Sequence, residues 1–567
     1  MTYDLVIRNG TVIDGSGLAR FRADVGVADG RIARIGRIAA TGSREIDADG
    51  QIVAPGFVDG HTHMDAQIAW DPLGTCSCWH GVTSVVMGNC GFTLAPARAD
   101  QRDLVVRNLE RAEDISAESM AQGIEWTWET YAEYLDTVER LPKGINYAGY
   151  VGHSALRTWA MGERAFEQAA TDDDVAAMTH ELRSALRAGA IGFTTSRTAN
   201  HQTSDDRPVA SRLASWTEVT ALVDVMRQEG HGIFEIANED VGRDEDKQDE
   251  YYQRLSTLAI ETGVPITFGV AGGRISHGEH RKMLDLFDTT AARGGRMFGQ
   301  AHAREFNLVL SFKTQLPFDV LPEWQEVRSW PQAKQLNALR DPAVREKLIA
   351  AAQGGTWSRR VGPQARRPDY DWIRVMDGPM PPYRTVAQVA AERGVDPVEC
   401  MIDLAVETQF EQFFLQPILN GDPDVVLEIM RHPRCIVTFS DSGAHVSQIM
   451  DSSIPTHLLG YWVREREAFS LEQAVQMITL APATAWGFHD RGLLRDGMAA
   501  DLCIFDPLTV GPGMPEVVND LPGGSVRLVQ KGTGIAATVV NGEILTLNGE
   551  HDGALPGRLL RSGAATR

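Results

Sequence analysis

Short apolar runs recur through the middle of the chain, and stretches of helical character separate several of them. The runs are residues 83–87, 147–151, 190–193, 231–236, 265–268, 308–311 and 435–439, and helices are expected over 174–188 and 250–261. Continuous apolar runs of this length are typical of strands buried on both faces. Strands and helices that alternate over about 400 residues predict an α/β protein built on a parallel barrel, in which the loops after the strands carry the chemistry.

The two ends of the chain differ from the middle, because both consist of short strands joined by tight turns. Asn9-Gly10 near the start and Asn541-Gly542 near the end are turns of the hairpin type. The shared pattern predicts that the two ends fold together. The expected division is a small β domain of residues 1–56 plus 486–567, and a barrel of residues 57–485.

One stretch of the central part, about residues 315–399, interrupts the alternation of strands and helices. It contains many prolines and four tryptophans, which are Trp324, Trp330, Trp357 and Trp372. Proline marks turns and loops. We expect this stretch to be an insertion that lies over the mouth of the barrel.

Charge and composition exclude several classes of function. Lys and Arg number 54 against 76 Asp and Glu, so the 567-residue chain has a formal charge of −22, which argues against a nucleic-acid or anionic-membrane surface. Six cysteines are too few for a disulfide framework. No apolar run is long enough to span a membrane, and the first residues lack the pattern of a signal peptide. We expect a cytoplasmic protein that acts on a small molecule. Whether it forms a homo-oligomer stays an open question.

A pair of histidines follows the first apolar segment of the central part. His61 and His63 are two residues apart, so in an extended chain both imidazoles point to the same side. Neutral imidazole is a good ligand for zinc and other late first-row divalent ions. The spacing alone is also compatible with two ordinary solvated histidines after a glycine-rich turn.

The residues around this pair, and several motifs downstream, form a recognisable series. Residues 55–63 read Pro-Gly-Phe-Val-Asp-Gly-His-Thr-His, and the further motifs are residues 81–92 with Gly88-Asn89-Cys90-Gly91, then 151–157, 439–445, 480–485, 497–501 and 540–543. In this order they resemble the amidohydrolase superfamily, and within it the N-acyl-D-amino-acid deacylase-like branch. Several separate motifs in the expected order are much harder to obtain by chance than any one of them.

The resemblance implies both a fold and a metal site. The implied fold is a distorted (β/α)8 TIM-like barrel with a small β-sandwich domain built from both chain ends, which agrees with the layout read from the pattern. The implied metal ligands are His61, His63, Cys90 and Asp441. Zinc is favoured because the Cys90 thiolate is a ligand that suits it. Asp441 is also expected to take a proton from the attacking water and pass it to the leaving amine.

The sequence departs from the branch at three strand ends. Histidines that the branch usually carries are missing from residues 234–239 and 265–270; Glu235 could replace the first of them as a carboxylate ligand, but nothing replaces the second. We therefore expect one metal ion rather than two. The branch usually carries a lysine just beyond the second of these histidines, and residues 269–273 lack it. How a substrate carboxylate is recognised therefore stays open. Arg197, at a third strand end, could bind an acidic group instead.

Two further residues are candidates for contact with the substrate. His153 and Arg157 lie one helical turn apart after a predicted strand, so they could face the carbonyl or carboxylate of a substrate. The alternative is that these side chains stabilise a strand-to-helix turn. For His302 we expect a surface position rather than a place at the metal.

These observations favour a metal-dependent hydrolase of a linear amide, such as an N-acyl-D-amino acid or a related N-acyl compound. A first alternative keeps the metal and water chemistry but acts on a cyclic amide or lactam. A second alternative is a non-enzymatic binding module on the same fold. The presence of His61, His63, Cys90 and Asp441 together argues against that second alternative.

Overall fold

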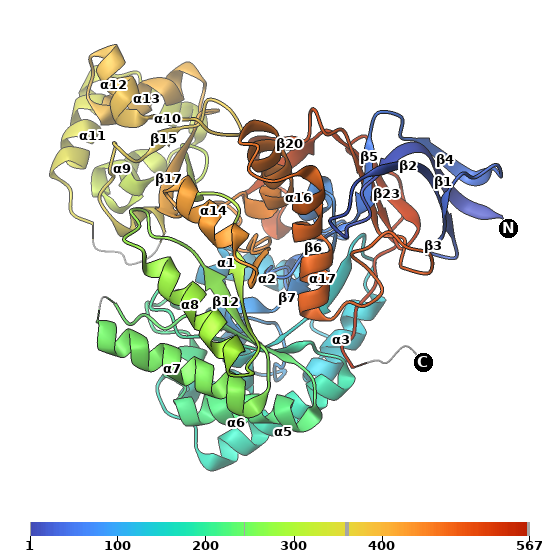
Figure 1. The fold of residues 1–567 in the computed structure, drawn as a ribbon. Coiled ribbons are helices and arrows are strands. Elements are labelled where there is room, and N and C mark those ends of the chain that lie inside the picture. The colour runs from blue at the N-terminus through green and yellow to red at the C-terminus, as the bar shows by residue number, and fades with distance from the viewer. Residues whose placement is uncertain (1, 243, 358–361, 564–567) are drawn as a thin grey trace.

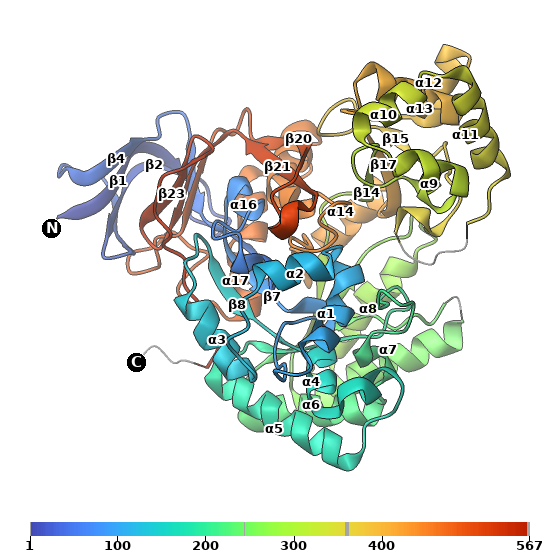
Figure 2. The same ribbon diagram turned by 180° about the vertical axis from the view of Figure 1, so that it is seen from behind.

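Both ends of the chain meet in one nine-stranded sheet. The computed structural model describes residues 2–242, 244–357 and 362–563. The sheet has the order β24-β23-β22-β19-β5-β1-β2-β3, with β4 paired to β1. Its strands are β1 (Tyr3–Val12), β2 (Phe21–Ala28), β3 (Arg31–Gly36), β4 (Gly42–Asp47), β5 (Ile52–Pro55), β19 (Leu502–Phe505), β22 (Ile535–Val540), β23 (Glu543–Leu547) and β24 (Glu550–His551). In both views its blue and red strands lie together at one corner of the molecule (Figures 1 and 2).

The central part consists of parallel strands, in one sheet of three and one of six. The three-stranded sheet has the order β6-β7-β8 and the other has the order β18-β13-β12-β11-β10-β9. The strands are β6 (Phe57–Asp59), β7 (Val82–Met87), β8 (Asn146–Gly149), β9 (Val151–Gly152), β10 (Gly192–Ser196), β11 (Ile233–Ala237), β12 (Ile266–Val270), β13 (Met297–Ala301) and β18 (Cys435–Val437). Most of these strands are buried along their whole length, as their continuous apolar runs predict. The prediction of an α/β protein is confirmed.

Helices follow most of these strands and cover the sheets. They are α1 (Arg102–Glu113), α2 (Ala117–Gly123), α3 (Tyr131–Arg140), α4 (His153–Met161), α5 (Asp172–Ala188), α6 (Trp216–Glu229), α7 (Glu245–Thr262), α8 (Glu279–Ala292), α14 (Pro423–Arg431), α15 (Ile454–His457), α16 (Leu471–Ile478) and α17 (Leu480–Trp486). Local sequence sets their ends: α5 begins with a capping box of Thr171 and Asp174 and ends at Gly189, whose φ is 112°. No helix within the described ranges has an apolar stretch that could cross a bilayer.

The inserted part has its own sheet and its own hydrophobic core. Four strands pair in the order β14-β17-β15-β16. The elements are β14 (Phe306–Ser311), β15 (Arg374–Val375), β16 (Arg384–Thr385), β17 (Phe413–Leu419), α9 (Pro322–Arg328), α10 (Gln332–Ala338), α11 (Pro342–Gly354), α12 (Val386–Arg393) and α13 (Pro397–Glu407). We call residues 306–419 the inserted unit. Its helices stand apart from the rest in both views (Figures 1 and 2).

The inserted unit is longer than the predicted residues 315–399, and one strand was assigned to the wrong sheet. Residues 308–311 lie in β14, which pairs antiparallel with β17 and so belongs to the inserted unit. The parallel position is taken by β13, which sequence analysis missed because Gly299 and Gln300 weaken its apolar pattern. The tryptophans also differ from expectation: Trp324 is buried in the core of the unit, where its indole donates to the Leu348 carbonyl at 3.0 Å.

Candidate metal centre

The two histidines sit on a short extended segment that continues β6 and is held on both sides. The Thr62 amide donates to the Val86 carbonyl at 3.0 Å on one side, and Thr62 forms a parallel bridge with Ser442 on the other. The Asp441 amide donates to the His61 carbonyl at 3.2 Å, and the His63 amide donates to the Ser442 carbonyl at 2.8 Å. Backbone pairing thus fixes the loop after β18 against the loop after β6. Since Thr62 points the other way, His61 and His63 face the same side.

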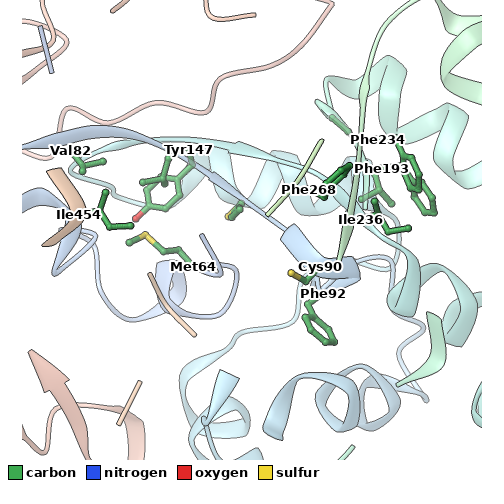
Figure 3. Close-up of a cluster of buried hydrophobic side chains, with 14 of the residues drawn as sticks. Met64, Val82, Cys90, Phe92, Tyr147, Phe193, Phe234, Ile236, Phe268 and Ile454 are labelled. Carbon is green, nitrogen blue, oxygen red and sulfur yellow. The ribbon is translucent and has the colours of Figure 1, made fainter. Parts of the chain in front are cut away.

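Cys90 reaches the histidines from the end of β7. Gly88 and Cys90 both have left-handed backbone conformations, with φ of 83° and 55°, so the chain turns sharply there. The Asn89 side chain stabilises the turn by donating to the carbonyls of Thr62 and Val86, each at 3.0 Å. The Cys90 amide donates to Glu235 Oε2 at 2.8 Å. The thiol lies near Phe92, in the same cluster of buried hydrophobic side chains as Phe193, Phe234 and Phe268 (Figure 3).

Four predicted ligands come together in the structure. Ligand atoms of His61, His63 and Cys90 all lie within 4.8 Å of one another, and all three residues are buried. His61 Nε2 is 3.5 Å from Cys90 Sγ and 3.1 Å from Asp441 Oδ1, and His63 Nε2 is 3.5 Å from the same Oδ1. Zinc bonds of about 2.0–2.3 Å in a tetrahedral arrangement place donor atoms on the order of 3.4 Å apart. Asp441 Oδ1 is buried without a hydrogen-bond partner among the described residues, as expected of an atom positioned for a cation. The donor set therefore fits a divalent metal.

The other ring nitrogens of the two histidines meet polar side chains. His61 Nδ1 is 2.5 Å from Gln300 Oε1, and His63 Nδ1 is 3.2 Å from Glu113 Oε1. Such contacts fix the orientation of a ligating imidazole and leave its Nε2 for the metal. Sequence analysis missed both partners. A polar residue within β13 was a usable signal for Gln300, whereas nothing in the sequence pointed to Glu113 at the end of α1.

Negative groups outnumber positive ones around the ligands. Burial alone would lower the pKa of His61, but Cys90 and Asp441 outweigh it and raise the pKa to about 10. Burial would raise the pKa of Asp441, but the His61 and His63 imidazoles hold it well below its usual range. Burial raises the pKa of Glu235 to about 7. A cation bound among these groups offsets the cost of burying them.

The ligands open into a cavity of about 540 Å³. Its walls come from the loops after the parallel strands and from the inserted unit. The lining includes His61, His63, Cys90, Glu113, His201, Glu235, Asn238, Phe439, Asp441 and His445, together with Phe306, Leu308, Gln364, Ala365, Arg366, Ile418 and Leu419 of the inserted unit. None of the four tryptophans predicted for the cover is among these residues. The volume suits a small organic molecule.

Glu235 is close to the centre, but its hydrogen bond is to the backbone of the Cys90 turn. Its Oε2 accepts the hydrogen bond from the Cys90 amide, and its carboxylate lines the cavity. The tight group of ligand atoms consists of His61, His63 and Cys90 without it. Glu235 as a further ligand therefore stays a prediction, whereas its contact with the Cys90 turn is a feature of the fold.

His153 and Arg157 do not reach the cavity, and the predicted contact with substrate is corrected. Both side chains are fully buried. His153 contacts Thr195 Oγ1 at 2.8 Å and Glu218 Oε1 at 2.9 Å, and Arg157 donates to both Glu218 oxygens, at 2.5 and 2.6 Å. The contacts agree with the alternative, in which the pair stabilises the turn from β9 into α4.

Two other candidates are also placed away from the metal ligands. Arg197 donates to the Ala214 carbonyl, lies 3.5 Å from Glu239 and lies over the Trp216 ring at 5.4 Å. It does not line the cavity, which argues against the predicted contact with an acidic substrate group. His302 is buried rather than on the surface; its Nδ1 is 2.9 Å from the Arg304 carbonyl and its Nε2 is 3.5 Å from Asp451. Spacing in the sequence could not reveal these partners, because they come from distant segments.

Comparison with known proteins identifies the family of the chain. A family model described as "Amidohydrolase family" matches residues 44–546, which is most of the chain. The chain belongs to the amidohydrolase family. It is 28% identical to the D-aminoacylase of Alcaligenes xylosoxydans xylosoxydans over 580 residues, which cover 99% of this chain and 98% of that protein.

Two further relatives of this amidohydrolase are N-acyl-D-glutamate deacylases. The enzyme from the same Alcaligenes is 29% identical over 512 residues, which cover 89% of this chain and 88% of that one. The solved structure from Bordetella bronchiseptica, complexed with zinc and a phosphonate inhibitor, has a TM-score of 0.66 and 26% identity, and the match covers 99% of this chain and 100% of that one. The predicted resemblance to the deacylase-like branch is confirmed.

We expect about one tightly held divalent ion per chain of this amidohydrolase, because the described residues offer one compact ligand group. Elemental analysis after dialysis measures the number. Cys90→Ser should lower it well below one, since the thiolate is lost. Cys435→Ser, a half-buried cysteine outside the ligand group, is the matched control and should keep one ion. Two stoichiometric ions in the wild-type protein would contradict the single site.

Glu218→Gln should lower the free energy of unfolding by about 3–5 kcal/mol, because it leaves the buried Arg157 charge without its carboxylate. Burial would raise the pKa of Glu218, but His153 and Arg157 lower it to about 2. The stabilisation is thus present above the ordinary carboxyl pKa and is lost as the pH falls toward 2. Thermal unfolding at neutral and acid pH measures both effects. A normal Tm together with a raised KM would instead support the predicted role of His153 and Arg157 in substrate binding.

Proposed function

We propose that this amidohydrolase hydrolyses the linear amide bond of an N-acyl-D-amino acid or a related N-acyl compound, with zinc as the divalent metal. The observation that carries the proposal is the buried group of His61, His63 and Cys90, with Asp441 beside it, at a cavity of about 540 Å³. A D-aminoacylase and an N-acyl-D-glutamate deacylase that resemble almost the whole chain support the substrate class. A zinc complex of a related deacylase supports the metal.

The proposal includes a closed arrangement of the parallel strands. The three-stranded and six-stranded sheets would form one distorted (β/α)8 barrel, next to a small β domain made of residues 1–56 and 486–567. Two contacts support closure: the Thr438 hydroxyl donates to Asp59 Oδ1 at 2.8 Å, and Thr62 bridges Ser442, so the segment after β18 meets β6. At the other junction, β8 and β9 are separated by Tyr150 alone. The cytoplasmic location and a homo-oligomer stay predictions from the sequence.

Each residue of the centre has a part in the proposed reaction. His61, His63, Cys90 and Asp441 would hold the zinc ion, which would supply Lewis acidity and make a water molecule a stronger nucleophile near neutral pH. Asp441 takes the proton that the attacking water loses and delivers it to the nitrogen of the leaving amine. Gln300 and Glu113 orient the two imidazoles, and the apolar residues Phe306 and Leu308 exclude water from the acyl group.

A screen of N-acyl-D-amino acids and their L enantiomers with the zinc-loaded protein tests the function. We expect release of the free amino acid from D substrates, faster than from the L forms, with one product amine per amide consumed. Cyclic amides such as hydantoins are included in the same screen. Hydrolysis of a cyclic amide, with no turnover of any linear N-acyl compound, would replace the proposal by the alternative substrate class.

Asp441→Asn should lower kcat by about 10²–10⁴-fold, the range for removing a positioned general base. Asp285→Asn, an exposed aspartate on α8, is the matched control and should leave kcat unchanged. Steady-state kinetics and elemental analysis are measured on both variants. Loss of metal in Asp441→Asn would show that its role as ligand dominates, and turnover near the wild-type rate would exclude the role of proton acceptor.

A further inference from the structure

Two arginines line the cavity, and only one of them has hydrogen-bond partners among the described residues. Arg111 donates to Asp206 Oδ1 at 2.6 Å and to the Ser204 carbonyl at 2.9 Å. Arg366, in the inserted unit, is exposed and forms no hydrogen bond or ion pair with any residue that the structure describes. No carboxylate of the described residues therefore pairs with this guanidinium, although the chain has a net charge of −22.

The backbone directs Arg366 into the cavity. Arg366 has an extended conformation, with φ of −145° and ψ of 156°, directly after the short helical turn Pro363–Ala365. Successive side chains of an extended chain point to opposite sides. Arg367 points to the inserted unit, where it donates to the Gln353 carbonyl and lies 5.9 Å from the centre of the Trp357 ring. Arg366 therefore points the other way, to the side on which Gln364 and Ala365 also line the cavity.

The surroundings of Arg366 favour an organic anion. The inserted unit also provides an apolar wall of Phe306, Leu308, Ile418 and Leu419. On the ligand side, Glu113 and Asp441 lie close to histidines and Glu235 accepts from the Cys90 amide, so these carboxylates face the metal centre. A bound anion would give the guanidinium the charged partner that the described residues do not supply. Arg and carboxylate form two parallel hydrogen bonds, which fixes orientation as well as charge.

We propose that Arg366 of the inserted unit recognises a carboxylate of the substrate and thereby makes the enzyme selective for acidic N-acyl compounds. This inference rests on the proposed function and names the group that the substrate must carry. The carboxylate has two sources in an N-acyl-amino acid, the α-carboxylate and a side-chain carboxylate. Arg366 would act as a specificity residue, since it contacts neither the metal ligands nor, in the proposed reaction, the amide bond.

Three substrates of nearly equal size separate the two sources. They are N-acetyl-D-glutamate, N-acetyl-D-glutamine, which lacks the side-chain carboxylate, and N-acetyl-D-isoglutamine, which lacks the α-carboxylate. With wild-type enzyme, replacing the recognised carboxylate by an amide should lower kcat/KM by about 10- to 100-fold, the range for a charged hydrogen-bonded pair. Arg366→Gln should lower kcat/KM for N-acetyl-D-glutamate by the same factor, mainly through KM, and should leave the substrate without that carboxylate unaffected. Arg366→Lys should retain part of the selectivity.

Arg340→Gln is the matched control, because Arg340 is an exposed arginine of the same unit that does not line the cavity. It removes the same charge and should keep the wild-type selectivity. An equal effect of Arg366→Gln on all three substrates, or no effect on any, overturns the inference while the proposed function stands. Binding of phosphonate analogues of the three substrates to the zinc-loaded protein, measured by calorimetry, tests Arg366 without turnover. An unchanged Kd in Arg366→Gln overturns the inference even if no amide is hydrolysed.

Discussion

The backbone pairing between the segment after β6 and the segment after β18 is the constraint on which the centre depends. Two amide–carbonyl bonds, from Asp441 to His61 and from His63 to Ser442, join segments far apart in the chain. They place the Asp441 carboxylate next to both imidazoles through backbone pairing alone. The cost is local strain, since Phe439 and Asp441 have left-handed backbones with φ of 87° and 52°. Strain of this kind persists only where the surrounding structure holds it, and it is common at functional sites.

Buried charge is the second condition that the centre imposes on the protein. The imidazoles, the Cys90 thiol and the carboxylates of Asp441, Glu113 and Glu235 are all removed from water. Burying such groups is costly unless they are paired or bound to a metal. The metal therefore has a role in folding as well as in chemistry, because its binding free energy is available only to the folded chain. The polar partners Gln300 and Asn89 share this role by fixing an imidazole and the Cys90 turn.

The inserted unit contributes to the cavity but supplies none of the four candidate metal ligands. Its sheet and helices form a hydrophobic core of their own, so the unit can change its cavity-facing residues without disturbing His61 or Cys90. It contributes an apolar wall and, with Arg366, a cation to the same cavity. Variation of loops above a fixed parallel scaffold is the common way in which such enzymes change substrates.

The sequence by itself indicated what depends on local pattern, which is the alternation of strands and helices and the joined ends of the chain. The resemblance of its motifs to a family pointed to His61, His63, Cys90 and Asp441 as candidate ligands. Tertiary structure decided what depends on partners distant in sequence. Gln300 lies in a strand too polar to be recognised, and residues 308–311 belong to an antiparallel sheet because β17, more than a hundred residues later, pairs with them. His153 and Arg157 have the spacing of a binding pair, yet Glu218 on α6 neutralises them in the core. Spacing fixes the direction of a side chain, whereas its role depends on the groups that the fold brings to it.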